Sequence, residues 1–242
     1  MRRDVVWQDA ALVESFVQRT RGGVPYGADQ LAVLVRVARA GARPVRRFLD
    51  VGCGSGVVAL TLLEAFPGAQ AVLVDFSEPM LAAAREATAG IVPAPLIAAG
   101  DLAAPAWSEA IANHAPFDLV ASCYAIHHLD DARKRALYAE IHGLLAPGGL
   151  FVNVEHVASR SAWGEQLSDE LMVDAQHAWR VGQGEAVSRA EVAERHATRA
   201  DKAANILAPV EDQCAWLRAI GYADVDCFFK VFEMAVFGGR RL

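Results

Sequence analysis

Three acidic side chains, each close to the end of a short apolar run, are the first candidates for binding chemistry. They are Asp50, Asp75 and Asp101. Because parallel strands end at one edge of an α/β sheet, these carboxylates are expected to meet a ligand there. Asp75 could accept hydrogen bonds from both ribose hydroxyls of a nucleoside, and Asp101 could hold an adenine amino group with Leu102 packed on the ring. The alternatives are a helix cap for Asp75 and an ordinary turn for Asp101.

A glycine-rich turn follows Asp50, with glycines at the alternate positions 52, 54 and 56. Glycine is needed where a turn takes a positive φ angle or where a ligand lies against the backbone. The helical apolar pattern that begins at Val57 would place free N–H groups beside that ligand. The dinucleotide fingerprint would need a small residue at position 57. The pattern is therefore Asp-x-Gly-x-Gly-x-Gly, and a purely structural turn is the alternative.

Short apolar runs and helical apolar patterns alternate through most of the chain, which predicts strands that alternate with helices. This alternation is typical of an α/β fold with a mostly parallel sheet. The last two runs lie so close together that they are expected to pair as antiparallel strands. The expected strands are 48–51, 71–75, 95–99, 117–122, 150–154, 225–230 and 232–237, with helices at 28–40, from 57, from 77, at 131–145 and at 209–220.

Two regions depart from this alternation within a domain that is expected to span residues 1–242. Residues 1–45 are expected to form an N-terminal helical cover. Residues 158–208 are expected to form a helical cap inserted before the final strands. Such insertions beside a binding edge often become lids.

The predicted cap contains two helical patterns of different character. In the first, Trp163, Leu167 and Leu171 recur at helical spacing and are expected to face a pocket. The second begins at Ser188, and Glu191 completes the spacing of a capping box. This second helix is polar enough to face water.

Composition and charge narrow the class of protein. With 242 residues, of which 54% are hydrophobic, the chain can bury a sizeable core. The formal net charge of −6 argues against non-specific binding of nucleic acid. No apolar run is long enough to span a membrane, and no signal core follows the N-terminus. The four cysteines show no paired spacing, which fits a reducing, cytoplasmic setting. A homodimer is an alternative to a monomer that the sequence leaves open.

Five motifs, in their order and spacing, resemble those of the class I S-adenosylmethionine (SAM) dependent methyltransferases. They are Asp50–Gly56, Val74–Met80, Gly100–Leu102, Ile126–Asp130 and Leu145–Gly149. The resemblance implies a Rossmann-like α/β fold, with a seven-stranded, mostly parallel sheet, an antiparallel last strand and helices on both faces. It also implies methyl transfer (EC 2.1.1.-) from SAM to a small-molecule acceptor, with S-adenosylhomocysteine (SAH) as the product.

The resemblance assigns cofactor contacts to individual residues. The glycine-rich turn would line the methionine and ribose part of SAM, and Phe76 would lie beside the adenine. Tyr26 resembles an N-terminal aromatic residue that reaches the cofactor, although the local order Val-Pro-Tyr-Gly departs from the expected Val-Pro-Gly-Tyr. The implied cofactor-binding residues are Tyr26, Asp50, Gly52, Cys53, Gly54, Asp75, Phe76, Met80, Asp101, Leu102 and Cys123.

The candidates for proton transfer follow the fourth and fifth strands. Alignment of nucleophile, methyl group and sulfur can supply most of the acceleration, and a base is needed only if the acceptor must lose a proton. His127 and His128 are the main candidates because histidine titrates near neutral pH, and Glu155 is the next. Capping or packing is the alternative for the histidines. Together with Asp130 and Asp131, they match no metal-ligand motif, so no metal is expected.

Three residues of the predicted cap are candidates for binding the acceptor. Trp163 and Trp179 could shape its pocket, and core packing is the alternative for both. Arg180 could bind an anionic acceptor.

The C-terminal segment Pro209–Asp226 is similar to the tail of the carboxy-SAM synthase branch and its uncharacterised methyltransferase relatives. Carboxy-SAM synthases use an arginine just before this tail, whereas Ala204–Ala208 contains none, although Arg199 or Lys202 could substitute. Two alternative functions therefore stay open. One is a carboxy-SAM synthase-like or tRNA-modification enzyme, and the other is a non-catalytic module that binds SAM or SAH.

Overall fold

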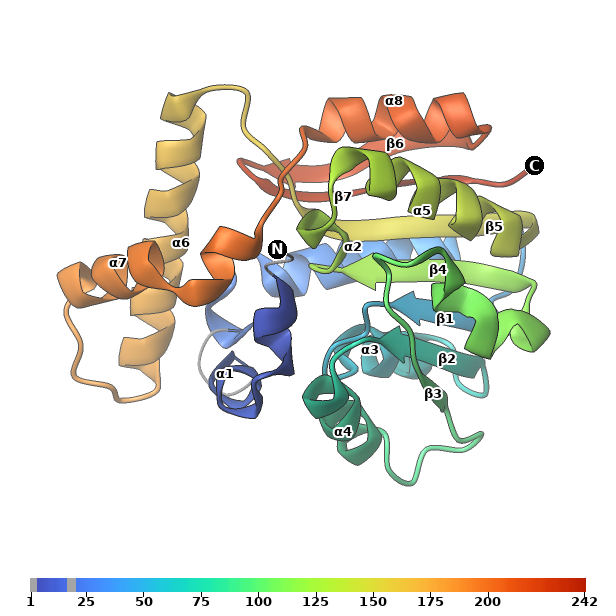
Figure 1. Ribbon diagram of the computed structural model, residues 1–242, viewed down its shortest axis with the longest axis horizontal. Coiled ribbons are helices and arrows are strands. Elements are labelled where there is room, and N and C mark those ends of the chain that lie inside the picture. Colours follow the sequence, from blue (N-terminus) through green and yellow to red (C-terminus); the bar gives the residue numbers. More distant parts are fainter. Residues whose placement is uncertain (1–3, 17–20) are drawn as a thin grey trace.

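A seven-stranded sheet with helices on both faces forms the body of the protein. The computed structural model describes residues 4–16 and 21–242, and Figure 1 shows the arrangement of their elements. The strands are β1 (Arg47–Val51), β2 (Gln70–Asp75), β3 (Leu96–Ala99), β4 (Phe117–Cys123), β5 (Leu145–His156), β6 (Ala223–Val231) and β7 (Met234–Arg240).

One set of helices lies between the first five strands in the chain. A second group lies before β1, and a third lies between β5 and β6. The α-helices are α1 (Ala10–Ser15), α2 (Gly27–Arg39), α3 (Val57–Ala65), α4 (Glu78–Ala87), α5 (Asp131–Leu144), α6 (Ala162–Gly182), α7 (Arg189–Thr198) and α8 (Val210–Ile220). Short 3₁₀ helices are η1 (Asp4–Gln8), η3 (Arg21–Gly23), η4 (Pro105–His114), η5 (Ile126–His128) and η6 (Ala200–Ala204).

The sheet order is β3-β2-β1-β4-β5-β7-β6, and β7 runs antiparallel to both of its neighbours. The predicted seven-stranded, mostly parallel sheet with an antiparallel last strand is therefore confirmed. The chain passes from β1 outward to β3 and then returns to β4 on the other side of β1. Ligands of open α/β sheets bind at such a switch point, beyond the carboxyl ends of the strands. Val51 at the end of β1 lies between Val74 of β2 and Ser122 of β4, which brings these strand ends together.

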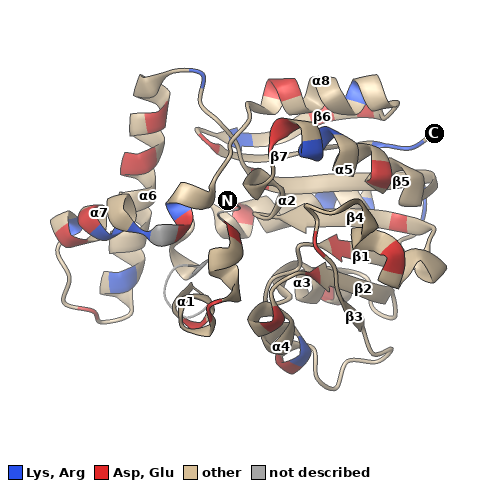
Figure 2. Cartoon of the chain, viewed as in Figure 1, with Lys and Arg blue, Asp and Glu red and all other residues tan. Residues whose placement is uncertain are grey.

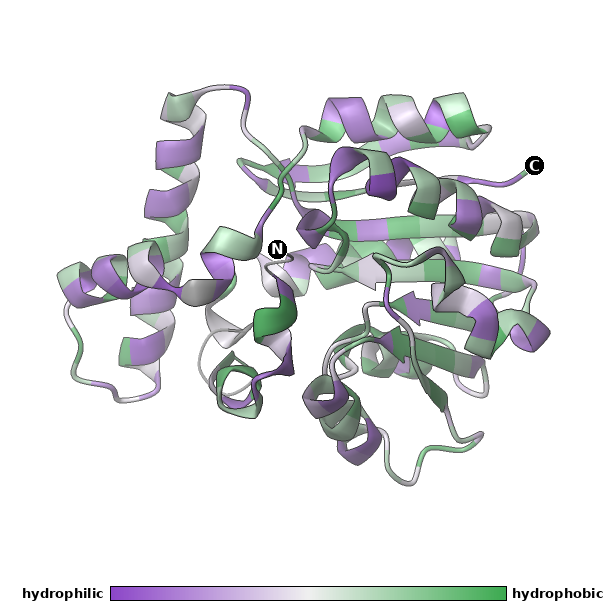
Figure 3. Cartoon of the chain, viewed as in Figure 1, coloured by the Kyte–Doolittle hydropathy of each residue, from purple (hydrophilic) through white to green (hydrophobic). Residues whose placement is uncertain are grey.

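Two apolar layers cover the two faces of the sheet, and Figure 3 shows green hydrophobic bands throughout the strands. On one face, α2, α3 and α4 bury Leu34, Leu62 and Leu81 against the central strands. On the other face, α5 and α8 bury Tyr138 and Leu217. Strands that are covered on both faces have continuous apolar sequences, which explains why their positions could be predicted from the sequence.

The cap consists of α6 and α7, which extend away from the sheet beyond the carboxyl ends of the strands (Figure 1). The predicted capping box is present, since Ser188 accepts from the Glu191 amide and the Glu191 carboxylate accepts from the Ser188 amide. Figure 3 shows α7 mostly in purple, in agreement with the predicted polar helix.

The side chains of α6 that were predicted to face a pocket are not the buried ones. Trp163, at the start of the predicted apolar stripe, is 73% exposed. The buried side chains of α6 are instead Ser168, Met172, Val173, Gln176 and Arg180. A helix with apolar residues on more than one side can bury either stripe, and its packing partners decide which one.

Close packing of α6 against η3 explains this choice of face. A Cβ atom added at Gly22 would lie 2.4 Å from the Trp179 indole nitrogen, and one at Gly23 would lie 3.1 Å from the Gln176 Cα atom. Only glycine lets the two backbones approach this closely. The predicted N-terminal cover thus contacts the cap, although its residues 1–3 and 17–20 lie outside the described residues.

Among residues 4–16 and 21–242, no helix is long and apolar enough to cross a membrane. All four cysteines are free.

Candidate functional site

Backbone hydrogen bonds to β2 fix the glycine-rich turn after β1. The amides of Gly52 and Cys53 both donate to the Val74 carbonyl oxygen, at 2.8 and 3.0 Å. Gly52 has φ +66°, and a Cβ atom there would lie 2.2 Å from the Ala125 Cβ atom. This position therefore needs glycine for its conformation and for the close approach of the loop after β4.

Asp75 joins the glycine turn to the next helix through both of its carboxylate oxygens. Oδ2 accepts from the Gly54 amide at 2.8 Å, and Oδ1 accepts from the Ser77 amide at 2.9 Å. Burial raises the pKa of the Asp75 carboxyl, and these two backbone hydrogen bonds lower it in part. The Phe76 backbone is a third hydrogen-bond partner, and a carboxylate offers about four lone-pair positions. The carboxylate can therefore still accept hydrogen bonds from the hydroxyls of a ligand. Ser77, and not Asp75, caps α4.

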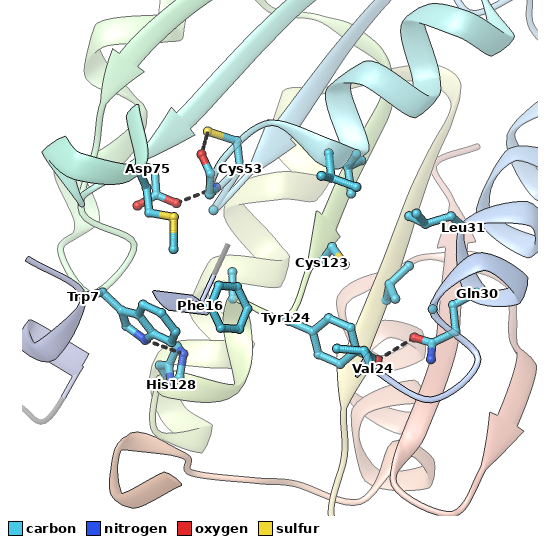
Figure 4. A pocket seen from close by; sticks show the side chains of 18 of the residues that line it. Trp7, Phe16, Val24, Gln30, Leu31, Cys53, Asp75, Cys123, Tyr124 and His128 are labelled. Atoms are coloured by element: carbon cyan, nitrogen blue, oxygen red, sulfur yellow. Dashed lines mark hydrogen bonds between the residues drawn. The ribbon is translucent and has the colours of Figure 1, made fainter. Parts of the chain in front are cut away.

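A cavity of about 530 Å³ opens in front of this turn (Figure 4). Eight of the implied cofactor-binding residues line it. Its volume lies within the range of about 300–1,000 Å³ that is usual for small-molecule sites. The eight residues are Gly52, Cys53, Gly54, Asp75, Phe76, Met80, Leu102 and Cys123.

Three other implied cofactor contacts do not line this cavity. Asp50 is fully buried within β1 and accepts from the Ala59 amide at 3.1 Å, so it supports the start of α3. Asp101 accepts from the Ala103 amide at 3.0 Å and helps to form the turn after β3. Tyr26 is 45% exposed and its ring packs toward Phe229 of β6, with 6.2 Å between the centroids.

A different tyrosine, Tyr124, enters the cavity just after β4. Its hydroxyl donates to Gln30 Oε1 at 2.6 Å, and the Gln30 amide nitrogen donates to the Pro25 carbonyl oxygen at 2.9 Å. The backbone of Tyr124 has φ +52°, which is unfavourable for a residue with a side chain. Such strain is found preferentially at functional sites. The sequence motifs do not point to Tyr124, although its place directly after Cys123 was the available signal.

The N-terminal segment forms the wall of the cavity that faces the glycine turn. Trp7 and Phe16 line the cavity and pack edge to face, with 5.0 Å between their ring centroids. The Ser77 hydroxyl donates to the Trp7 carbonyl oxygen, and the Gln8 side-chain amide donates to the Phe76 carbonyl oxygen at 2.8 Å. The segment is therefore fastened to the turn between β2 and α4. The sequence predicts a cover here, but its pattern does not point to these two aromatic residues.

Of the three candidate bases, His128 is the one that lines the cavity. Trp7 Nε1 donates to His128 Nε2 at 3.2 Å, and His128 Nδ1 lies 3.3 Å from the Ala204 carbonyl oxygen (Figure 4). These partners fix a neutral ring with its proton on Nδ1. Burial, followed by the neighbouring His127, lowers the pKa of His128 to about 3. In this arrangement the one basic lone pair is already engaged by Trp7.

The other two candidate bases, His127 and Glu155, lie outside the cavity and form a buried pair. His127 Nδ1 lies 2.6 Å from Glu155 Oε1, and the His127 amide donates to Glu155 Oε2 at 3.1 Å. Burial raises the pKa of Glu155 to about 7 and lowers that of His127. The His127 carbonyl oxygen accepts from the Ile206 amide at 2.8 Å, so the pair anchors the segment where the cap returns to the core.

The candidate acceptor residues separate into three locations. Trp179 lines the cavity, whereas the exposed Trp163 lies at the other end of α6 and lines none of the pockets described here. Arg180 lines a second pocket, of about 270 Å³, between the N-terminal segment and the cap. Within the described part of the chain, no cluster of His, Cys, Asp or Glu side chains has the geometry of a metal site.

Comparison with known proteins finds a family match for the central region. Residues 48–149 match the family described as "Methyltransferase domain". A trans-aconitate 2-methyltransferase of Acidovorax ebreus is 32% identical over 174 residues, which are 66% of this chain and 59% of that protein. A demethylmenaquinone methyltransferase of Thermus thermophilus is 37% identical over 111 residues, or 46% and 47% of the two chains. This chain therefore spans about half to three fifths of the length of these relatives.

A third relative covers more of the chain at lower identity. A carboxy-S-adenosyl-L-methionine synthase of Geobacter metallireducens is 26% identical over 190 residues, which are 77% of this chain and 72% of that protein.

Solved structures show the same fold. An O-methyltransferase family protein from Burkholderia thailandensis has a TM-score of 0.64 and 16% identity, covering 96% of this chain and 58% of that one. Human N-acetylserotonin methyltransferase in complex with SAM has a TM-score of 0.61 and 13% identity, covering 98% and 58%. The Rossmann-like class I methyltransferase fold predicted from the motifs is thus confirmed.

Proposed function

We propose that this chain, whose residues 48–149 match the family described as "Methyltransferase domain", is a class I SAM-dependent methyltransferase that transfers a methyl group from SAM to a small-molecule acceptor. The observation that carries the proposal is the cavity at the carboxyl edge of the sheet, where Asp75 and the glycine turn meet an aromatic wall. The cavity joins polar groups for a nucleoside to apolar surface for a second molecule.

The residues around the glycine turn fit the cofactor. Asp75 would hold the ribose hydroxyls, and Phe76 and Leu102 would cover the adenine from the apolar wall. The backbone at Gly54 is open enough for a ligand to lie against it, because the nearest atom to an added Cβ would be the Met80 sulfur at 3.8 Å. When bound, SAM supplies an electrophilic methyl group on a sulfonium.

The task of the protein residues is alignment and exclusion of water. The wall of Trp7 and Phe16 and the ring of Tyr124 would hold an acceptor against the cofactor. Holding two reactants in this way can account for about 7–11 kcal/mol of a barrier. If the acceptor must lose a proton, His128 is our candidate base, and it must first give up the hydrogen bond from Trp7. His127 and Glu155 would then act at a distance, by positioning the loop that carries His128.

Binding of SAM and SAH by isothermal titration calorimetry tests this proposal. We expect both to bind, with the heat of binding lost when Asp75 is replaced. A folded chain that binds neither ligand would reject both the methyltransferase and the alternative of a SAM- or SAH-binding module. Binding without methylation of any acceptor in a screen with labelled SAM would favour the binding module.

Carboxy-SAM synthesis is the second candidate, since the relative from Geobacter covers more than two thirds of both chains. The two cations that could replace the missing arginine lie elsewhere. Arg199 lines the second pocket, and Lys202 binds both carboxylate oxygens of Asp169 at 2.9 Å. We therefore predict that the chain does not make carboxy-SAM from SAM and prephenate. Mass spectrometry of the reaction gives the answer, and a product heavier than SAM by a carboxylate would contradict the prediction.

The acceptor, partners and cellular setting are part of the proposal. The relatives act on different small molecules, as their names trans-aconitate 2-methyltransferase and demethylmenaquinone methyltransferase state, which favours a small-molecule acceptor. The net charge of −6 disfavours tRNA as the substrate. The free cysteines fit the reducing, cytoplasmic setting that the sequence predicts. A homodimer stays a prediction, which light scattering would test.

A further inference from the structure

The second pocket brings three arginines together from the cap. Arg180 comes from α6, Arg195 from α7 and Arg199 from the turn after α7. Figure 2 shows blue bands on both helices and on that turn. The lining also includes Leu12 of α1 and Phe16, which follows α1 directly. A concentration of positive charge in a chain with a net charge of −6 requires an explanation.

Arg180 is the most buried of the three cations. It is 9% exposed, and its Nε atom is buried with no hydrogen-bond partner among the described residues. Its Nη1 atom lies 3.5 Å from Glu185, a long contact for an ion pair. An unpaired buried donor on a charged group is costly, so such an arrangement is typical of a site that a ligand completes.

The neighbouring charges leave the pocket positive. Asp201 is the one acidic residue that lines it, and it lies 3.5 Å from Arg199 Nε. His196 faces Asp169 at 2.8 Å, and burial lowers its pKa. The described lining therefore contains three guanidinium groups and one carboxylate. Guanidinium groups bind carboxylates and phosphates through pairs of parallel hydrogen bonds.

Trp7 and Phe16 connect this pocket to the cofactor cavity, because both side chains line both spaces. The two pockets therefore share one wall. A ligand with its anionic end among the arginines would have its other end at these two rings.

We propose that the second pocket binds the carboxylate or phosphate end of an acidic acceptor and so directs the other end past Trp7 and Phe16 to the cofactor. The inference rests on the proposed function, which it narrows to acidic acceptors. The pocket would select for charge, whereas the aromatic wall would select for the shape of the group that receives the methyl.

The first test is calorimetry of the full chain saturated with SAH, with citrate and inorganic phosphate as probes. We expect saturable binding of at least one probe. Arg180→Met and Arg199→Met should weaken it by at least about tenfold, and Arg180→Lys by less. Arg189→Met is the matched control, because this exposed arginine of α7 pairs with Asp174 outside the pocket. It should leave binding unchanged.

SAH affinity separates the failure of this inference from failure of the proposed function. It should be the same in the wild type and all four variants, which also shows that each variant is folded. A wild type that binds SAH but neither probe would overturn the pocket assignment. So would equal probe affinity in Arg180→Met, Arg199→Met and the wild type.

The second test is a methylation screen with labelled SAM and three groups of acceptors, namely small di- and tricarboxylates, organic phosphates and neutral phenols. We expect turnover within one of the two acidic groups, and the group that reacts distinguishes carboxylate from phosphate. Turnover should fall by at least about tenfold in Arg180→Met. Methylation of neutral acceptors alone, at equal rates in both proteins, would overturn the proposal.

Discussion

Two parts of the site are built in different ways. One is the glycine turn with Asp75, which we propose for the cofactor and call the cofactor half. The other is the cover, formed by the N-terminal segment around Trp7 and Phe16. The cofactor half is formed by backbone amides and by side chains at strand ends, such as the Gly54 amide that donates to Asp75. In the cover, side chains far apart in sequence meet one another, as in the hydrogen bond between Trp7 and His128. The first arrangement follows from parallel pairing of neighbouring strands. The second depends on how separate segments pack.

This difference in construction matches a difference between the two ligands. A site made from backbone and strand ends persists through many sequence changes, and it suits a cofactor shared by many enzymes. A site made from packed side chains changes with single substitutions, and it suits an acceptor that differs between relatives. The two halves are therefore expected to respond differently to substitution.

The largest effect is expected in the cofactor half. Asp75→Ala should lower SAM affinity by at least about tenfold, because each charge-assisted hydrogen bond contributes about 1.5–3 kcal/mol. The fold should persist, since Ser77 and not Asp75 caps α4. Calorimetry measures the affinity, and circular dichroism checks the fold. Unchanged affinity in a folded variant would mean that Asp75 only fastens the turn.

The junction between cover and cap should give an intermediate effect. Gly22→Ala places a Cβ atom 2.4 Å from the Trp179 indole nitrogen, so the Trp179 side chain or α6 itself must shift. Overpacking of this kind costs about 1–3 kcal/mol of the free energy of unfolding. Faster hydrogen exchange in α6, with SAH affinity nearly unchanged, is the expected measurement.

Gly182→Ala provides the control, because an added Cβ atom there has no neighbour within 4 Å. It should leave α6 as stable as in the wild type or slightly more so. Equal exchange rates in the two variants would show that η3 and α6 are not tightly coupled.

A further effect, spread over several pH units, concerns the contact between Trp7 and His128. Because the pKa of His128 is lowered to about 3, the unfolded chain binds one more proton than the folded chain between pH 6.5 and 3. The free energy of unfolding should therefore fall as the pH falls through this window, by at most about 1.4 kcal/mol per pH unit from this group. His128→Gln, whose amide supplies one donor and one acceptor, should remove that slope. Urea unfolding at pH 7 and pH 5 measures it, and parallel pH profiles in both proteins would show that His128 already titrates normally.

The sequence by itself determined the sheet and most of the cofactor half. Buried parallel strands read as apolar runs, and parallel pairing then brings residues such as Asp75 and Cys123 to one edge. Eight of the cofactor contacts that the family resemblance implies line the cavity. Asp50 and Asp101 do not line it, because an acid near a strand end can turn inward to bind backbone amides as easily as it can face a ligand.

Only the tertiary structure decided how the cover and cap are built. The repeat of α6 allows more than one buried face, and close approach to Gly22 and Gly23 selects the face that carries Arg180. Likewise, the sequence could name His128 as a base but not its partner, since Trp7 lies 121 positions away. Contacts of this kind arise from packing between distant segments. A periodic pattern shows which side chains are apolar, whereas the neighbouring surfaces decide which of them become buried.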